Sequence, residues 1–155
     1  MRKIVLSLHT TLDGFVAGLN GEMDWIKHDD DMFDLVGKFT DEADTALYGR
    51  KTYQIMENYW PTAADKPNAT KHDIEHSQWY NKVNKVVLSR TMHSKGSGKI
   101  TFIGDNIFSE INRLKHQTGK NILIFGSPTA AHSLMEDNLI DDYLLFKNPV
   151  LLGQG

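Results

Sequence analysis

The chain has 155 residues, a formal net charge of −3 at pH 7 and no cysteine. This length suits one domain, and we expect residues 1–155 to form a single domain. A slightly acidic chain without blocks of Lys and Arg is unsuited to the phosphate backbone of nucleic acids, which excludes that class of partner. The lack of cysteine excludes disulfides, thiolate metal sites and thiol nucleophiles, and is typical of a cytoplasmic protein.

No apolar run approaches the ~20 residues that a membrane-spanning helix needs, so we expect no membrane partner. The first apolar run, over residues 4–8, is also too short for the core of a signal peptide. Its β-branched and apolar residues instead predict a buried strand. The strand leads into Asp13 and Gly14, a pair that favours a turn.

Further along the chain, segments with strand composition alternate with segments of helical spacing. Helices are predicted from residue 30, over 52–57, over 72–82, around 107–114 and around 130–135, and strands over 46–48, 86–88, 122–125 and 143–146. Residues 62–70 and 93–99 carry Pro, Asn, Gly and Ser and are predicted to be loops. The alternation favours one mainly parallel sheet with helices on both faces.

Three short turns centred on Gly or Ser follow three of the predicted strands. Backbone N–H groups at a helix N-terminus bind phosphate, and glycine lets a ligand approach the backbone. One such turn is usually only a cap, but open α/β sheets bind ligands where their strands end, so the repetition predicts a nucleotide site. The candidate cofactor-binding residues are Gly49, Arg50, Lys51, Thr52, Ser89, Arg90, Thr91, Gly126, Ser127 and Thr129.

The order of motifs along the chain resembles the dihydrofolate reductase-like family, and more closely the bacterial subgroup related to the reductase (C-terminal) domain of riboflavin-biosynthesis proteins. The resemblance covers essentially the whole chain. It rests on LDG at 12–14, DW at 24–25, GRKTY at 49–53, YWP at 59–61, KVVLS at 85–89, GS at 126–127, LIDDY at 139–143 and PVLLGQG at 149–155.

This resemblance implies a three-layer α/β/α fold whose mainly parallel central sheet ends in an antiparallel C-terminal strand or hairpin. It also implies a homodimer and a chain that continues past Gly155. NADPH is the implied hydride donor, with its pyrophosphate at the first and third turns and its 2′-phosphate at the turn of Ser89, Arg90 and Thr91. The nicotinamide is expected against the first strand and the loop at Asp13.

The activity implied is the reduction of a small pyrimidine-like or pterin-like heterocycle, as in a 5-amino-6-(5-phosphoribosylamino)uracil reductase. Two departures limit the transfer from the family. A zinc deaminase domain needs cysteines that this chain lacks. Asp30 and Asp31 follow Trp25 at a spacing similar to that of folate reductases, but without their Leu-Pro-Trp context. Folate reduction proper is therefore kept only as an alternative to the pyrimidine-like or pterin-like substrate.

Candidates for contact with the substrate come from the loops that follow the first strand and the second helix. Asp13 is the first candidate to orient or protonate the substrate, although it is equally suited to cap the turn before Gly14. Asp30 is the second candidate, and its competing role is to complement a helix dipole. Trp25 and Trp60 could stack on a flat substrate or pack in the core.

Two further interpretations stay open. His72 and His76 lie four residues apart with acids between them, as in a zinc hydrolase, but Asp73 replaces the usual Glu and no third ligand is evident. Such a polar helix is more typical of a solvated face, so we expect no metal. The other interpretation is a nucleotide-binding module without catalysis, because a fold does not by itself establish chemistry.

Overall fold

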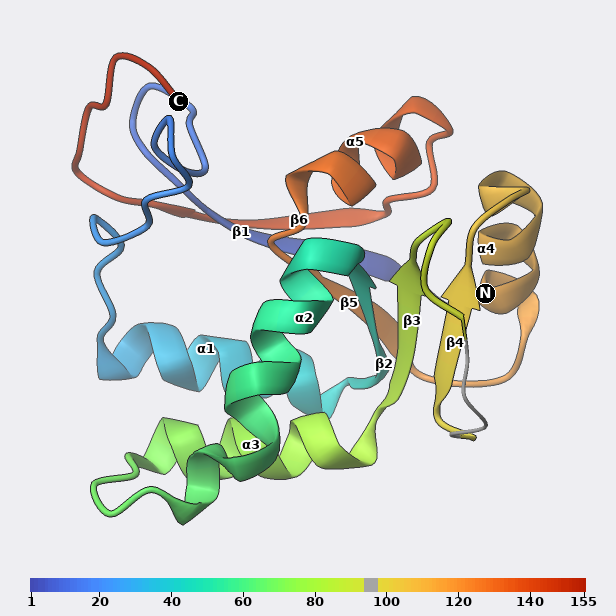
Figure 1. The fold of residues 1–155 in the computed structure, drawn as a ribbon, viewed down its shortest axis with the longest axis horizontal. Coiled ribbons are helices and arrows are strands. Elements are labelled where there is room, and N and C mark those ends of the chain that lie inside the picture. Colours follow the sequence, from blue (N-terminus) through green and yellow to red (C-terminus); the bar gives the residue numbers. More distant parts are fainter. Residues whose placement is uncertain (94–97) are drawn as a thin grey trace.

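Six parallel strands form one sheet in the computed structural model, which describes residues 1–93 and 98–155 (Figure 1). The strand order is β4-β3-β2-β5-β1-β6. The strands are β1 (Ile4–Thr10), β2 (Ala43–Gly49), β3 (Asn84–Leu88), β4 (Ile100–Ile103), β5 (Asn121–Phe125) and β6 (Asp142–Lys147). The helices are α1 (Asp30–Asp41), α2 (Arg50–Tyr59), α3 (Lys71–Lys82), α4 (Ile107–His116) and α5 (Pro128–Glu136), with a 3-10 helix over Trp60–Asp65.

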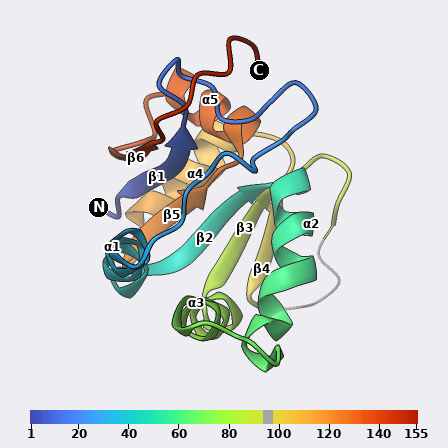
Figure 2. The ribbon, with the colours of Figure 1, turned by 90° about the vertical axis from the view of Figure 1, so that its left-hand side faces the viewer.

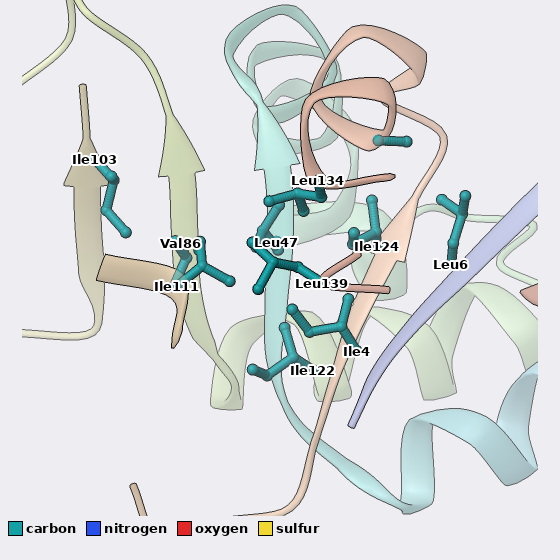
Figure 3. Packing of buried hydrophobic residues seen from close by; sticks show 11 residues of the cluster. Ile4, Leu6, Leu47, Val86, Ile103, Ile111, Ile122, Ile124, Leu134 and Leu139 are labelled. Carbon is teal, nitrogen blue, oxygen red and sulfur yellow. The ribbon is translucent and has the colours of Figure 1, made fainter. Parts of the chain in front are cut away.

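Helices cover both faces of the sheet, because successive side chains of a strand point to opposite faces. Figure 2 shows α1, α2 and α3 on one side and α4 and α5 on the other. Under α4 and α5 lies a cluster of buried aliphatic side chains (Figure 3), which includes Ile4, Leu6, Ile111, Ile122, Ile124 and Leu134. The opposite face is more aromatic, with Tyr48, Tyr53 and Tyr80 packed together. The three-layer fold expected from the resemblance is confirmed.

The C-terminal strand differs from the expectation. β6 runs parallel to β1, with Val5 opposite Asp142 and Thr10 opposite Lys147, whereas the resemblance implies an antiparallel strand. Its direction follows from α5, which connects β5 to β6. This helix runs back over one face of the sheet, so β6 starts at the same end of the sheet as β5. After β6 the chain lies beside the loop that follows β1 (Figure 1), and the Leu12 N–H donates to the Val150 carbonyl. Every strand pairing among the described residues is parallel.

The predicted strands and helices are confirmed, and β4 was not predicted. β4 has only four residues, too few for a clear period of two. The loop predicted over 62–70 begins inside the 3-10 helix, where Pro61 occupies a first-turn position at which its missing N–H costs nothing. Residues 94–97 of the loop predicted over 93–99 lie outside the described residues. None of the described helices has the length and apolarity needed to cross a bilayer.

Candidate functional site

The turns that follow β2, β3 and β5 lie together, because these neighbouring parallel strands end at the same edge of the sheet. They line a cavity of about 610 Å³, here called the turn cavity. Of the predicted cofactor-binding residues, eight line it: Gly49, Arg50, Lys51, Thr52, Ser89, Arg90, Ser127 and Thr129. The lining does not include Thr91, whose N–H donates to Ser89 Oγ at 3.2 Å, or Gly126, which faces a neighbouring cavity.

Helix α2 begins in the turn cavity with an unusual distribution of charge. Its N-cap residue Gly49 supplies no side-chain hydrogen bond, and the first turn contains no acid. Instead, the exposed side chains of Arg50 and Lys51 lie at the positive end of the helix dipole, where cations are unfavourable. The free N–H groups and both cations are therefore suited to an anionic ligand.

The third turn has a strained backbone that holds it against the first. Gly126 and Ser127 both have positive φ, at 59° and 55°, and Ser127 pays a steric cost that glycine does not. Ser127 is buried, and its Oγ accepts a hydrogen bond of 3.1 Å from the Gly49 N–H. This bond fixes the N-termini of α2 and α5 side by side. Strain of this kind is common at binding sites.

Gly104 also lines the turn cavity and was missed by sequence reasoning. A Cβ on this residue would lie 2.9 Å from the Ser89 carbonyl oxygen, so no larger residue fits without displacement. Gly104 follows β4 directly, and it could have been noticed as a fourth glycine turn after a strand. It escaped notice because β4 itself was not predicted.

A second cavity, of about 370 Å³, adjoins the turn cavity and shares Thr52, Ser127 and Pro128 with it. We call it the ring cavity, because aromatic and imidazole rings form much of its wall. Its other lining residues are Ser7, Leu8, His9, Val16, Ala17, Met23, Ile26, His28, Met32, Phe33, Val36, Ile55, Met56, Trp60, His72, His76, Phe125 and Gly126. These side chains come from β1, the loop after it, α1, α2, the 3-10 helix, α3 and the end of β5.

The rings of the ring cavity are stacked rather than scattered. Phe33 on α1 lies between His28 and His72, at centroid distances of 5.6 and 3.9 Å, and both pairs are within 11° of parallel. Deeper in the cavity, Trp60 packs against His76 at 4.3 Å. Packing of rings at these distances holds each of them in one orientation.

Burial changes the protonation of these histidines. Removal from water lowers the pKa of His76 to about 3, with a further contribution from His72. Burial also lowers the pKa of His9 and of His72, and the neighbouring His28 adds to both shifts. All three rings are therefore neutral at pH 7. Each then offers one N–H donor and one acceptor nitrogen.

The expectation of a solvated face for α3 is wrong at His76, whose side chain is only 8% exposed. This face of α3 packs under Trp60 and the end of β5, where Phe125 contacts the His76 ring. Asp73 is also engaged, since it forms a capping box with Thr70 and accepts a hydrogen bond from the Tyr59 hydroxyl. Within residues 1–93 and 98–155, no group of three His, Cys, Asp or Glu side chains is placed to hold a metal ion.

Asp13 lies outside the lining of both cavities. Its exposed carboxylate accepts hydrogen bonds from the Thr11 hydroxyl at 2.6 Å, the Gly153 N–H at 2.7 Å and the Leu152 N–H at 3.3 Å. These bonds, first that from Thr11, hold the pKa of Asp13 below its usual range. The carboxylate thus joins the loop after β1 to the C-terminal segment.

Of the other three residues predicted to contact the substrate, the structure places one in a cavity wall and two outside both cavities. Trp60 lines the ring cavity, whereas Asp30 and Trp25 line neither cavity. Asp30 is exposed at the start of α1, and the N-cap is the preceding Asp29, which accepts from the Met32 N–H at 2.7 Å. Trp25 donates its indole N–H to the Glu22 carbonyl at 3.0 Å.

Sequence reasoning missed most of the ring cavity. His9 gave one usable signal, since it is a polar residue at the carboxyl end of an apolar strand. His28 and Phe33 gave none, because a loop histidine and an apolar helix residue are common everywhere. Only the stacking of His28, Phe33 and His72 in the folded protein marks them as residues of a candidate site.

Comparison with known proteins identifies relatives over the full length of the chain. The RibD C-terminal domain family matches residues 2–155. The uncharacterized protein YyaP of Bacillus subtilis (strain 168) is 38% identical over 156 residues, which cover 99% of this chain and 78% of YyaP. The uncharacterized protein YwjB of the same organism is 28% identical over 159 residues, with 99% of this chain and 80% of YwjB covered.

Solved structures share the fold at lower identity. A putative riboflavin biosynthesis protein from Shewanella sp. PV-4 superposes with a TM-score of 0.70 at 21% identity, covering 99% of this chain and 80% of that one. A diaminohydroxyphosphoribosylaminopyrimidine deaminase/5-amino-6-(5-phosphoribosylamino)uracil reductase from Thermotoga maritima has a TM-score of 0.66 at 14% identity, covering 99% of this chain and 46% of that one. The family resemblance read from the motifs is confirmed.

Proposed function

Because the chain belongs to the RibD C-terminal domain family, a reductase family of riboflavin biosynthesis, we propose that it transfers a hydride from NADPH to a small heterocycle. One observation carries this proposal: the turn cavity and the ring cavity are contiguous through Thr52, Ser127 and Pro128. A dinucleotide cofactor and its acceptor need two adjoining spaces of this kind, so that the nicotinamide meets the acceptor at their junction.

The turn cavity is assigned the phosphates of NADPH. Its support is the start of α2, where Arg50 and Lys51 oppose the helix dipole until an anion is bound. Arg90, on the turn after β3, is assigned the 2′-phosphate that distinguishes NADPH from NADH. A pyrophosphate at the paired N-termini of α2 and α5 offsets the unfavourable charges there.

The chemistry is the addition of a hydride and a proton to a C=N bond. Bound NADPH would supply the hydride with its two electrons to the carbon, and a proton added to the nitrogen would complete the reduction, with NADP⁺ as the other product. The protein has to align the two rings, and the proton reaches the nitrogen from solvent. Asp13 receives a positioning role in this proposal, because it anchors the loop that brings Val16 and Ala17 to the ring cavity.

The family resemblance also leads us to propose a cytoplasmic homodimer. The dimer is supported by edge strand β6, whose outward side chains Tyr143 and Leu145 are 49% and 47% exposed. Exposed apolar side chains on a sheet edge are usually covered by a partner. The cytoplasm is supported by the absence of cysteine from the sequence.

The test is a fluorescence titration of the purified protein with NADPH and NADH, repeated with Arg90→Ala. We expect Arg90→Ala to weaken NADPH roughly tenfold or more, as the loss of a charge-assisted contact does, and to leave NADH unchanged. The matched control is Arg113→Ala, an exposed arginine on α4 that pairs with Glu110 outside both cavities. Equal loss for both cofactors, or no cofactor binding, would contradict the assignment.

Turnover separates reduction from binding alone. NADPH absorbance is followed in the presence of pyrimidines, pterins and dihydrofolate. Consumption with a pyrimidine or pterin supports the proposed reductase, and consumption with dihydrofolate alone supports folate reduction proper. Tight NADPH binding with no consumption supports a nucleotide-binding module.

A further inference from the structure

We propose that the ring cavity takes an uncharged, flat nitrogen heterocycle that carries no phosphate group. This inference rests on the proposed function, since it concerns the acceptor side of the same hydride transfer. It distinguishes this chain from the Thermotoga maritima protein, whose name specifies a phosphoribosyl compound as its substrate.

The shape of the ring cavity favours a flat ligand. Phe33 and His72 are 3.9 Å apart and nearly parallel, and the parallel stack continues from Phe33 to His28. Trp60 on the 3-10 helix and Phe125 at the end of β5 complete a wall of rings. Both faces of Phe33 are occupied by His28 and His72, so a planar molecule would meet ring edges and the outer imidazole faces, and such edge-to-face and offset contacts between rings are favourable.

The lining of the ring cavity is unsuited to a phosphate. Methionine, isoleucine and valine side chains from α1, α2 and the loop after β1 make up much of it. In the part of the chain that the structure describes, no Lys, Arg, Asp or Glu belongs to the lining. A phosphate dianion that left water for this surface would lose its hydration without gaining a counter-charge.

Three of the four histidines that line the ring cavity do not supply that counter-charge, and the fourth, His28, is exposed. Burial holds the pKa of His9, His72 and His76 below the ordinary value, so all three are neutral at pH 7. A neutral imidazole pairs one N–H and one bare nitrogen with its ligand. The edge of a pyrimidine or pterin ring presents the same mixture of donors and acceptors without a net charge.

Phosphate-binding groups are concentrated in the adjoining turn cavity. Arg50, Lys51 and Arg90 all line that cavity and none of them lines the ring cavity. The charges of a phosphorylated dinucleotide and the uncharged acceptor are thereby separated. In the reaction the acceptor's C=N carbon receives the hydride from NADPH, and its nitrogen receives a proton from solvent.

The experiment compares two ligands that differ only in a phosphate, 5-amino-6-(ribosylamino)uracil and its 5-phosphate, by calorimetric titration of the protein saturated with NADP⁺. Unsubstituted pterin is titrated as a third ligand. We expect the phosphate-free compounds to bind at least tenfold tighter than the phosphate, which corresponds to about 1.4 kcal/mol. Equal or tighter binding of the phosphate overturns the proposal, and so does the failure of all three ligands to bind.

Two matched variants locate the discrimination in the ring cavity. Ile55→Arg adds a cation at the cavity mouth, where Ile55 is 65% exposed on α2. It is expected to improve the 5-phosphate about tenfold relative to the ribosyl compound. Gln54→Arg adds the same charge one residue away, on an exposed position that lines neither cavity, and is expected to leave the ratio unchanged. An equal effect of the two variants overturns the assignment to this cavity.

Binding and turnover distinguish the failure of this inference from that of the proposed function. Binding of the phosphate-free rings without NADPH consumption supports the ligand class and contradicts the reductase. Reduction of the 5-phosphate in preference to the ribosyl compound contradicts the ligand class and supports the reductase.

Discussion

The two adjoining cavities are built in different ways. The turn cavity is formed mainly by short segments that directly follow β2, β3, β4 and β5, and its polar groups are those of the turn backbone, Ser and Thr hydroxyls and three cations. The ring cavity is formed by side chains from elements spread between β1 and the end of β5, and its polar groups are hydroxyls and imidazoles, of which those of His9, His72 and His76 are neutral at pH 7. A phosphate site can therefore be made by local turn geometry, whereas a site for a flat ring needs side chains brought together by the whole fold.

The difference extends to stability. The turn cavity carries unfavourable charges at the start of α2, so a ligand relieves a local cost. The ring cavity instead buries histidines in their neutral form, so its cost appears on acidification. Each of the following changes alters one cavity and leaves the other as a reference.

The largest effect is expected from acid acting on the ring cavity. Burial lowers the pKa of His76 from 6.5 in the unfolded chain to about 3 in the folded protein. At a pH between these two values the unfolded chain binds a proton at His76 that the folded protein does not bind, so the free energy of unfolding rises with pH. This contribution is complete above 6.5 and is lost as the pH falls toward 3, a change on the order of a few kcal/mol. His72 and His9 shift in the same direction.

Urea unfolding at a series of pH values measures this slope. His76→Phe is expected to flatten it, because the replacement ring has no proton to bind. His116→Phe, at an exposed position on α4, is the control and should retain the slope. An unchanged slope in His76→Phe would show that the acid sensitivity arises elsewhere.

Reversing the charges at the start of α2 is expected to have opposite effects on binding and stability. Arg50→Glu with Lys51→Glu should weaken NADPH about a hundredfold, since two charge-assisted contacts are lost. The same variant should raise the free energy of unfolding without ligand by roughly 0.5–2 kcal/mol, because acids complement the dipole there. Titration and urea unfolding measure the two quantities, and a loss of both would indicate a structural role for the cations.

Adding a side chain where Gly104 closely approaches Ser89, beside the turn cavity, is expected to have a smaller effect than the charge reversal. Gly104→Ala places a Cβ 2.9 Å from the Ser89 carbonyl and should destabilise the protein by roughly 1–3 kcal/mol, with weaker NADPH binding. Gly37→Ala is the control on α1, where a Cβ meets nothing within 4 Å, and should stabilise the protein by about 0.5–1 kcal/mol. Equal thermal unfolding of the two variants would remove the argument from close approach.

The smallest effect separates ring stacking from hydrogen bonding in the ring cavity. His72→Ala removes both the stack on Phe33 and the imidazole nitrogens, whereas His72→Phe keeps the stack. A stacked pair is worth about 0.5–1.5 kcal/mol, so the free energy of unfolding should be lower in His72→Ala than in His72→Phe by at least about this amount. Equal urea unfolding of His72→Ala and His72→Phe would show that the stack adds nothing to stability.

Much of the fold could be predicted because its signals are local. The apolar runs that became β1 and β5, and the helical spacing that became α1 and α4, each act within about ten residues. The turns at Gly49 and Gly126 followed from the same patterns, since glycine preferences depend on backbone conformation alone. β4 could not be predicted in this way, because four residues between turn formers are too few to show the alternation typical of a strand.

Only part of the candidate site could be predicted from such local signals. Parallel strands end at one edge, so the turns after β2, β3 and β5 had to meet once the alternation was recognised. Asp13 shows the limit, because nothing near it in the chain indicates that its carboxylate accepts from Gly153, 140 residues away. Such a contact depends on the order of strands in the sheet.

The sequence by itself determined the alternation of strands and helices, the three turns and the presence of Arg50, Lys51 and Arg90 in two of them, because these depend on the preferences of neighbouring residues. Only the tertiary structure decided that Phe33 stacks on His72, that His76 is buried and neutral, and that β6 is parallel to β1. Helix packing and strand order bring distant residues together, and burial then changes their protonation. No short window of sequence contains that information.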